Sequence, residues 1–147
     1  MSDIQSVWDP QTQHADYVIA NGAFASGHDV ETAVLMSVFT DRLADLNDVI
    51  PDARAGTPGD RRGWWADEQQ HRLGSRLWLL DRSKGPLTVA AEARGYAAES
   101  LQWLIDDGVV AKFDIRAQSV KPNQLQLLVV AHRSDGTVIS NQPINLW

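Results

Sequence analysis

Apolar and polar residues alternate along the last third of the chain. The odd positions of residues 109–117 are apolar, whereas the even positions of residues 112–118 are polar. That alternation is typical of a β-strand with one buried face. A Pro-Asn turn at 122–123 leads into a second apolar run, QLQLLVVAHR, and a Ser-Asp-Gly turn at 134–136 leads into a third, TVISNQ. The pattern predicts a C-terminal antiparallel three-strand meander.

The N-terminal part predicts a β-hairpin followed by a helix. The Asn-Gly pair at 21–22 favours a type I′ turn, because both central residues of that turn need positive φ. Residues 17–19 and 23–25 can supply the two short strands. Asp29 then stands where an N-cap belongs, before residues 30–43, whose apolar positions recur at helical spacing. We expect a mostly buried helix over this range.

Two further segments show helical periodicity. Residues 65–82 place leucines on one face, with Gly74 as a weak point in the helix. Residues 86–107 carry another apolar stripe, and Gly108 is well placed as the residue that ends the helix. The sequence therefore predicts an α+β fold in which an N-terminal β-hairpin and about three helices pack on the C-terminal antiparallel three-strand meander.

A polar stretch rich in Asp, Gly and Pro, residues 41–63, separates the first two predicted helices. It is long for a connection inside one domain, and such loops are usually functional or held by a partner. The whole chain has 147 residues, about the length of one domain. We therefore expect a single domain over residues 1–147 in which residues 41–63 are ordered by a partner.

Composition narrows the class of protein. Hydrophobic residues make up 44% and charged residues 22%, which fits a folded chain and not a disordered one. The absence of cysteine excludes disulfides, thiolate zinc sites and a thiol nucleophile. Residues 1–10 do not read as a signal peptide, and no run reaches the ~18 apolar residues that cross a bilayer. The net charge of −6 has the wrong sign for a general nucleic-acid binder. We expect no membrane and no nucleic-acid partner.

Charge is segregated along the chain. Residues 1–60 contain ten acids and two bases, whereas residues 61–84 contain three acids and six bases. The two segments could pair with each other on the surface, where each ion pair contributes at most ~1 kcal/mol. They could instead meet oppositely charged neighbours, which would set the choice of partner. The sequence leaves both alternatives open.

Candidates for catalysis or metal binding are weak. The four histidines are scattered, and no serine lies in a G-x-S-x-G motif. Four aspartates within residues 41–52 lie three and four apart, a spacing more typical of a solvated face than of a catalytic pair. The same segment fails as a calcium loop, because Ile50 replaces the turn glycine and Gly56 the bidentate glutamate. We expect no catalytic residue, no metal and no cofactor.

Tryptophan is unusually frequent, with six residues against two Tyr and three Phe. Trp78 and Trp103 fall within predicted helices and Trp8 lies near the predicted hairpin, so we expect these three to pack internally. Two adjacent tryptophans point in different directions on any regular element, and a terminal residue frays unless it docks. Trp and Arg are also enriched at binding hot spots. The candidate partner-binding residues are therefore Arg61, Arg62, Trp64, Trp65 and Trp147.

The order of motifs along the chain resembles that of a known family. The motifs are GHDVETAVLMSVFTDR within residues 22–42, GDRRGWWAD at 59–67, GSRLWLLDR at 74–82, LQWLIDDGV at 101–109, RSDG at 133–136 and a closing LW. Together they resemble the small baseplate wedge protein of Mu-like contractile phage tails, from about residue 8 onward. The combination of GDRRGWW with GSRLWLL is the most specific part. That protein is related to the lysozyme-named wedge subunits of T-even phages and to TssE of type VI secretion systems.

The resemblance implies an assembly role without chemistry. Such a subunit joins the large baseplate wedge protein and a second wedge or tail protein near the hub and spike, and it presents a sheet edge that templates the first ring of tail sheath. It implies several copies around a sixfold tail axis, in the virion tail baseplate, after assembly in the host cytoplasm. In the wider group a wedge-facing E-P-R motif follows the first long helix. This chain has no such string, so only the region up to Trp65 is carried over as wedge-facing.

Two other classes of function remain as alternatives. The lysozyme label of the wider group implies a peptidoglycan muramidase, or tail lysozyme, although the sequence offers no identifiable acid and nucleophile pair. The arginines and tryptophans of GDRRGWW could also stack on and neutralise a single-stranded nucleic acid. The overall acidity and the lack of a wider basic stripe argue against that interpretation.

Overall fold

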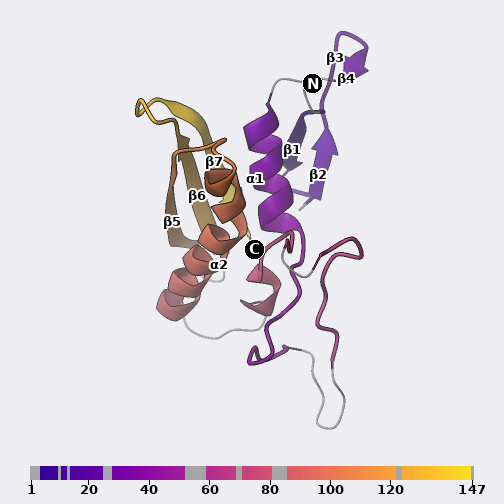
Figure 1. Ribbon diagram of the computed structural model, residues 1–147, viewed down its shortest axis with the longest axis vertical. Coiled ribbons are helices and arrows are strands. Elements are labelled where there is room, and N and C mark those ends of the chain that lie inside the picture. Colours follow the sequence, from indigo (N-terminus) through magenta and orange to yellow (C-terminus); the bar gives the residue numbers. More distant parts are fainter. Residues whose placement is uncertain are drawn as a thin grey trace.

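The computed structural model describes residues 4–9, 11–12, 14–24, 28–51, 59–68, 71–80, 86–121 and 124–146. The two α-helices lie on one side of a three-stranded sheet, and two small hairpins lie beyond α1 (Figure 1). The elements in chain order are β1 (Ser6–Asp9), β2 (His14–Tyr17), β3 (Ile19–Ala20), β4 (Ala23–Phe24), α1 (Asp29–Phe39), η1 (Leu77–Leu80), α2 (Pro86–Asp106), β5 (Lys112–Lys121), β6 (Gln124–His132) and β7 (Val138–Asn145).

The N-terminal segment forms two hairpins where one was expected. The predicted turn is present: Asn21 and Gly22 both have positive φ, at 52° and 78°, and join β3 to β4. The hairpin of β1 and β2 was missed, because four-residue strands of mixed polarity give no clear alternation. Its connection is supported by the Asp9 carboxylate, which accepts hydrogen bonds from the backbone N–H of Gln11 and the hydroxyl of Thr12, both at 2.8 Å.

The first helix is shorter than its periodicity suggested. It covers Asp29–Phe39, and Thr40 follows in an extended conformation with ψ 134°. The chain leaves the helix there because Asp41 forms a parallel bridge with Ser75. The expected cap at Asp29 is wrong: His28 occupies the N-cap position without a side-chain cap. The His28 ring instead lies 2.5 Å from the Glu31 carboxylate, between Nδ1 and Oε2.

The expectation of about three helices is also wrong. In place of a helix over residues 65–82, the described residues form a loop and the short 3₁₀ helix η1. Gly74 has φ +100°, and a Cβ added there would lie 2.3 Å from the carbonyl oxygen of Thr40. The Ser75 backbone N–H donates to that same carbonyl at 2.8 Å, and its hydroxyl donates to the carbonyl of Val38 at 2.6 Å. These tertiary bonds override the leucine spacing, while the α+β class itself agrees with the structure.

The second helix, α2, begins and ends where the sequence places it. Proline is favoured in a first helical turn because its missing N–H has no helical partner there. At the other end Gly108 has φ +73°, and the Val109 N–H donates to the carbonyl of Leu104 at 3.0 Å. Within the described part of the chain, no helix is both long and apolar enough to cross a membrane.

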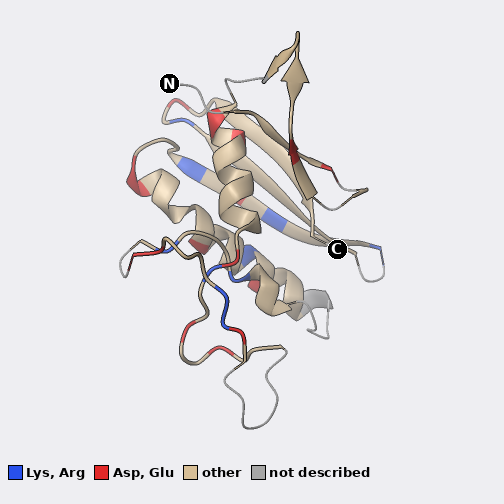
Figure 2. Cartoon of the chain, turned by 90° about the vertical axis from the view of Figure 1, so that its right-hand side faces the viewer, with Lys and Arg blue, Asp and Glu red and all other residues tan. Residues whose placement is uncertain are grey.

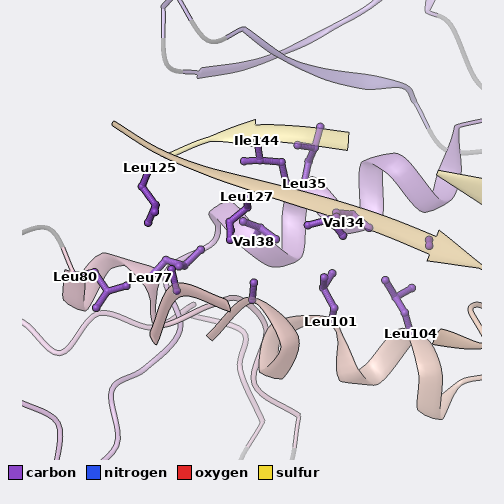
Figure 3. Packing of buried hydrophobic residues seen from close by; sticks show 14 of the residues in the cluster. Val34, Leu35, Val38, Leu77, Leu80, Leu101, Leu104, Leu125, Leu127 and Ile144 are labelled. Carbon is purple, nitrogen blue, oxygen red and sulfur yellow. The ribbon is translucent and has the colours of Figure 1, made fainter. Parts of the chain in front are cut away.

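The C-terminal meander is present in the expected strand order. β6 is central, with antiparallel β5 and β7 at its sides, and strict alternation of burial along β6 gives the sheet one inner face. That face packs on both helices (Figure 3). The fully buried residues include Val34 and Val38 of α1, Leu101 and Leu104 of α2, Leu127 and Val129 of β6, and Ile144 of β7.

Candidate functional site

The candidate site lies in the irregular region between α1 and α2. Its described parts are residues 41–50, residues 59–68, here called the Arg-Trp loop, and residues 71–80. The three segments are connected by backbone hydrogen bonds. The Ala44 N–H donates to the carbonyl of Arg61 at 3.1 Å, and the Arg42 N–H donates to the carbonyl of Ser75 at 3.0 Å. The region therefore has a defined course although it contains little regular structure (Figure 1).

The two arginines of the Arg-Trp loop point inward. Arg61 donates through Nη2 to the carbonyl of Ala44 at 3.2 Å and also to the carbonyl of Asp45. Arg62 forms an ion pair with Asp41, and its guanidinium carbon lies 5.1 Å from the ring centroid of Trp78. Both side chains were expected to bind a partner. In the structure both hold the loop against residues 41–45.

The two tryptophans point outward instead. Trp65 is 91% exposed and Trp64 is 43% exposed, with their ring centroids 5.6 Å apart and their planes tilted by 52°. Asp67 fixes the turn that carries them: its N–H donates to the carbonyl of Trp64 at 3.0 Å, and its carboxylate accepts from the N–H of Leu73 at 2.9 Å. A fixed turn therefore presents a large, freely accessible indole. The fifth predicted residue, Trp147, lies outside the described residues.

The remaining tryptophans, Trp8, Trp78 and Trp103, were all expected to pack internally, and one of them does so only in part. Trp78 is buried, and its indole N–H donates to the carbonyl of Arg42 at 2.9 Å. Trp8 stacks on Phe39 at 3.8 Å between ring centroids. Trp103 was expected in the core but is 41% exposed, and its N–H donates to the Ser37 hydroxyl at 3.0 Å.

Arg76 is the residue that sequence reasoning missed. Its guanidinium donates to Asp48 at 3.0 and 3.1 Å and to Glu99 at 3.0 and 3.3 Å, and it lies 3.0 Å from the Asp45 carboxylate. It also covers the Tyr96 ring at 4.8 Å. We call Asp45, Asp48, Arg76, Tyr96 and Glu99 the Arg76 cluster. Only the charge segregation of the sequence pointed toward it.

Burial and charge shift two pKa values in the Arg76 cluster. Burial alone would lower the pKa of Arg76, but its hydrogen bonds to Asp48 and Glu99 outweigh that effect and raise it above its ordinary value. Burial raises the pKa of the Tyr96 phenol, against the opposing effect of the Arg76 charge. Arg76 thus remains a cation that joins two acidic segments at all accessible pH values.

Figure 2 shows acidic and basic residues on the same loops of this region, and their side chains form ion pairs across it. Asp41, Asp45 and Asp48 come from the acidic segment, and Arg62, Arg72 and Arg76 come from the basic one. Of the two alternatives left open by the sequence, the structure shows internal pairing for these residues. The charges therefore order the loop, while the exposed apolar side chains remain available for a neighbour.

A second set of exposed apolar residues lies on residues 41–50 and was not predicted. Leu46 is 94% exposed and Val49 is 86% exposed, both next to the carboxylates that bind Arg76. Isolated exposed leucines are ordinary on protein surfaces. Here they accompany Trp65 in a region where Arg61, Arg62 and Arg76 are already bonded internally.

Two observations bear on whether this region could hold a metal ion or a small molecule. Among the described residues, no group of three His, Cys, Asp or Glu side chains is placed to hold a metal ion. A hollow of about 730 Å³ lies between residues 71–73 and α2, with Trp103 and Glu99 in its wall. Glu99 is already bound to Arg76 at 3.0 Å. The site therefore offers an exposed aromatic surface held by ion pairs.

Comparison with known proteins agrees with the motif order. The family model described as "Phage protein GP46" matches residues 30–138. The chain belongs to this family. It is 37% identical over 141 residues to "Baseplate protein gp46" of Escherichia phage Mu, covering 95% of this chain and 92% of that protein. It is also 28% identical over 139 residues to "Mu-like prophage FluMu protein gp46" of Haemophilus influenzae, covering 93% and 91%. The matched range of the family contains α1 from its second residue onward, all of α2, the Arg-Trp loop and the Arg76 cluster.

Proposed function

We propose that this chain is a structural subunit of a contractile phage tail baseplate. The proposal is supported by membership of the GP46 family and by the 37% identity, over nearly the full length of both chains, to a protein named as a baseplate protein of phage Mu. Its place of action is then the virion tail baseplate. Its partners are other baseplate components.

The finer proposal is that the subunit links larger wedge proteins through the Arg-Trp loop. The observation that supports it is the 91% exposed Trp65 on a turn that internal bonds already fix. A large aromatic ring held in a defined position loses little conformational entropy on binding, which makes it a suitable hot spot. Arg61 and Arg62 take part by holding the loop and do not themselves need to touch the partner.

The subunit also anchors or initiates the tail sheath in this proposal. β5 and β7 are the edge strands of the sheet, and an edge strand can pair with a strand of another chain. The large wedge protein, a second wedge or tail protein and the sheath would then surround the subunit near the hub and spike. Several copies would lie around the sixfold tail axis, assembled in the host cytoplasm.

The test is to replace Trp64 and Trp65 together with alanine and to measure tail formation by electron microscopy. We expect the purified variant to unfold at the same temperature as the natural protein, because neither ring is buried in the core. We expect tails to be absent or to lack a baseplate. The matched control is Val109→Ala, an exposed apolar residue just after α2 at 48% exposure, which should leave assembly intact. Normal tails from the double variant would contradict the proposal.

We further propose that the subunit acts without enzymatic chemistry. A muramidase needs a carboxylic acid with a raised pKa as its general acid. Among the residues that the structure describes, the two carboxylates with clearly shifted pKa values are shifted the other way: the Gln11 N–H lowers the pKa of Asp9, and the Thr137 hydroxyl lowers that of Asp135. Purified protein incubated with cell walls at several pH values should release no muropeptides. Release of muropeptides would establish the tail lysozyme alternative.

A further inference from the structure

The hollow of about 730 Å³ noted above lies against the C-terminal half of α2, between this helix and residues 71–73. Trp103, Asp106 and Asp107 line it from the side of α2. Ligand-binding clefts commonly have volumes of about 300–1,000 Å³, so the hollow is large enough to receive a side chain and the peptide units next to it. Among the described residues, its lining includes none from the Arg-Trp loop or from the sheet.

Trp103 is held in place through its polar edge. Its Nε1 donates to the hydroxyl of Ser37 at 3.0 Å, and that fully buried hydroxyl donates in turn to the carbonyl of Ala33 at 2.7 Å. The indole N–H is thus bonded inside the fold, although Trp103 is 41% exposed. An accessible indole attracts a cation to its π electrons, and a ring that is already fixed loses little conformational freedom when it does so.

The end of α2 has the opposite charge from the one that a helix C-terminus favours. The partial negative charge of the backbone at this end is stabilised by Lys, Arg or His. The last turn of α2 has no basic residue; it contains Asp106, and Asp107 follows directly. Asp106 accepts a hydrogen bond from Gln102 at 2.9 Å, and neither carboxylate forms an ion pair with a residue that the structure describes. Such uncompensated departures from a local rule are expected at functional sites.

The arginines that also line the hollow do not neutralise these two aspartates. Arg42 lies 3.9 Å from the Glu99 carboxylate, and Arg72 lies 3.6 Å from that of Asp45. Glu99 precedes Asp106 by seven residues, which is about 10 Å along the helix axis. This separation exceeds the Debye length of about 8 Å at physiological ionic strength. The end of the hollow at Asp106 therefore keeps its negative charge.

We propose that this hollow binds an arginine side chain from a segment of another subunit. The guanidinium lies against the Trp103 indole and pairs with the carboxylates of Asp106 and Asp107. Arginine suits both contacts, because its planar cation stacks on aromatic rings and donates several hydrogen bonds to carboxylates. The inference rests on the proposed function in taking that subunit to be another baseplate component. It adds a binding surface on α2 to the one on the Arg-Trp loop.

Replacing both aspartates separates binding from stability. In the isolated subunit, Asp106→Asn with Asp107→Asn should unfold at an equal or higher temperature, because two negative charges leave the negative end of a helix. In competition with the natural subunit for incorporation into tails, the same variant should be weakened about fivefold. The matched control is Glu92→Gln, an exposed carboxylate on α2 outside the hollow, which should compete normally. Incorporation of the double variant equal to that of the control would overturn the inference.

A peptide titration tests the same site without assembly. The probe is a capped tripeptide of glycine, arginine and glycine, and the readout is the indole N–H resonance of Trp103 in the full-length subunit, identified by its loss in Trp103→Phe. We expect a saturable shift that weakens several-fold as salt is raised. Binding should be about fivefold weaker in the double aspartate variant. The same peptide with glutamine in place of arginine should cause no shift.

The titration also separates this inference from the proposed function. An equal response to the arginine and glutamine peptides, or no response to either, would overturn the inference and leave the role of the Arg-Trp loop standing if the Trp64 and Trp65 variant still blocks tail formation. A saturable response to arginine alone would support the inference even if that variant forms normal tails, which would contradict only the role of the Arg-Trp loop.

Discussion

The layer of sheet and helices and the region of residues 41–80 are held together in different ways. Between the sheet and its helices, contacts are made by leucine, valine and alanine side chains such as Leu101, Leu127 and Val34. In the described parts of residues 41–80, a smaller buried apolar cluster of Ala44, Ile50, Trp78 and Leu79 is joined by arginine guanidinium groups. These groups bind backbone carbonyls, as at Arg61, or carboxylates, as at Arg76. Apolar packing stabilises the fold in proportion to the area buried. Ion pairs fix the orientation of the side chains they join and contribute less to the free energy of folding.

The difference explains why exposed apolar side chains remain in the loop region and not on the inner face of the sheet. The inner face of the sheet uses its apolar residues against the helices, as Figure 3 shows, and leaves none for a neighbour. The loop region binds Arg61, Arg62 and Arg76 internally and leaves Trp65, Leu46 and Val49 exposed. The packed sheet and helices therefore carry a loop region that ion pairs help to hold in place and whose apolar side chains are partly exposed to solvent. Four substitutions test this contrast, and they are ordered here by the size of the expected effect.

The largest effect is expected in the core. Leu127 is fully buried in the middle of β6, so Leu127→Ala should lower the free energy of unfolding by about 3–5 kcal/mol, measured by urea denaturation. Leu128→Ala is the matched control, because the neighbouring side chain lies on the outer face and is only partly buried. Similar losses for both variants would mean that the sheet has no distinct inner face.

The second effect concerns the junction between the two regions. Gly74→Ala should lower the free energy of unfolding by about 2–4 kcal/mol, since the added Cβ meets the Thr40 carbonyl at 2.3 Å on a backbone with φ +100°. Gly136→Ala is the matched control: its φ is +86°, but nothing lies within 4 Å of an added Cβ. Thermal unfolding of both variants separates the destabilisation caused by the close contact from that caused by the backbone conformation alone. Equal losses would show that residues 71–80 do not pack on α1 as described.

The third effect is intermediate and depends on salt. Arg76→Met should lower the free energy of unfolding by about 1–3 kcal/mol, because it leaves Asp48 and Glu99 without their cation. Part of that loss should disappear at high salt, where the natural protein is also weakened. Arg116→Met on the exposed face of β5 is the control and should have almost no effect. A salt-independent loss would indicate that Arg76 acts through packing on Tyr96 and not through charge.

The smallest effect on stability is expected at the exposed tryptophan. Trp65→Ala should change the free energy of unfolding by less than about 0.5 kcal/mol, because its side chain is 91% exposed. Denaturation of the purified variant measures this directly. A loss above about 1 kcal/mol would show that the ring supports the fold of the Arg-Trp loop rather than remaining available for a partner.

The same contrast separates what could be predicted from the sequence and what could not. The meander and α2 follow from local signals: alternation along β6, and Pro86 and Gly108 at the ends of the helix. The loop region depends on contacts between residues far apart in sequence. Ser75 bonds to residues 38 and 40, and Arg76 joins Asp48 to Glu99, so leucine spacing alone wrongly predicted a helix there.

The partner-binding role of the RRGWW segment stays a prediction, and the sequence indicated only part of its setting. Composition marked this segment as unusual. It could not show that Arg61 and Arg62 face inward, because that direction is set by the carbonyls of Ala44 and Asp45 and the carboxylate of Asp41. The exposure of Trp65 follows from the same bonds, since the turn is held from the opposite side by Asp67.

The most direct test of the central claim is the accessibility of Trp65 before and after assembly. Oxidative labelling of tryptophan, read residue by residue by mass spectrometry, can compare the isolated subunit with purified tails. Trp78 is only 8% exposed and provides an internal reference that should react slowly in both. The account predicts that Trp65 reacts rapidly in the isolated subunit and is protected in tails. Equal reactivity of Trp65 in the two states would contradict it.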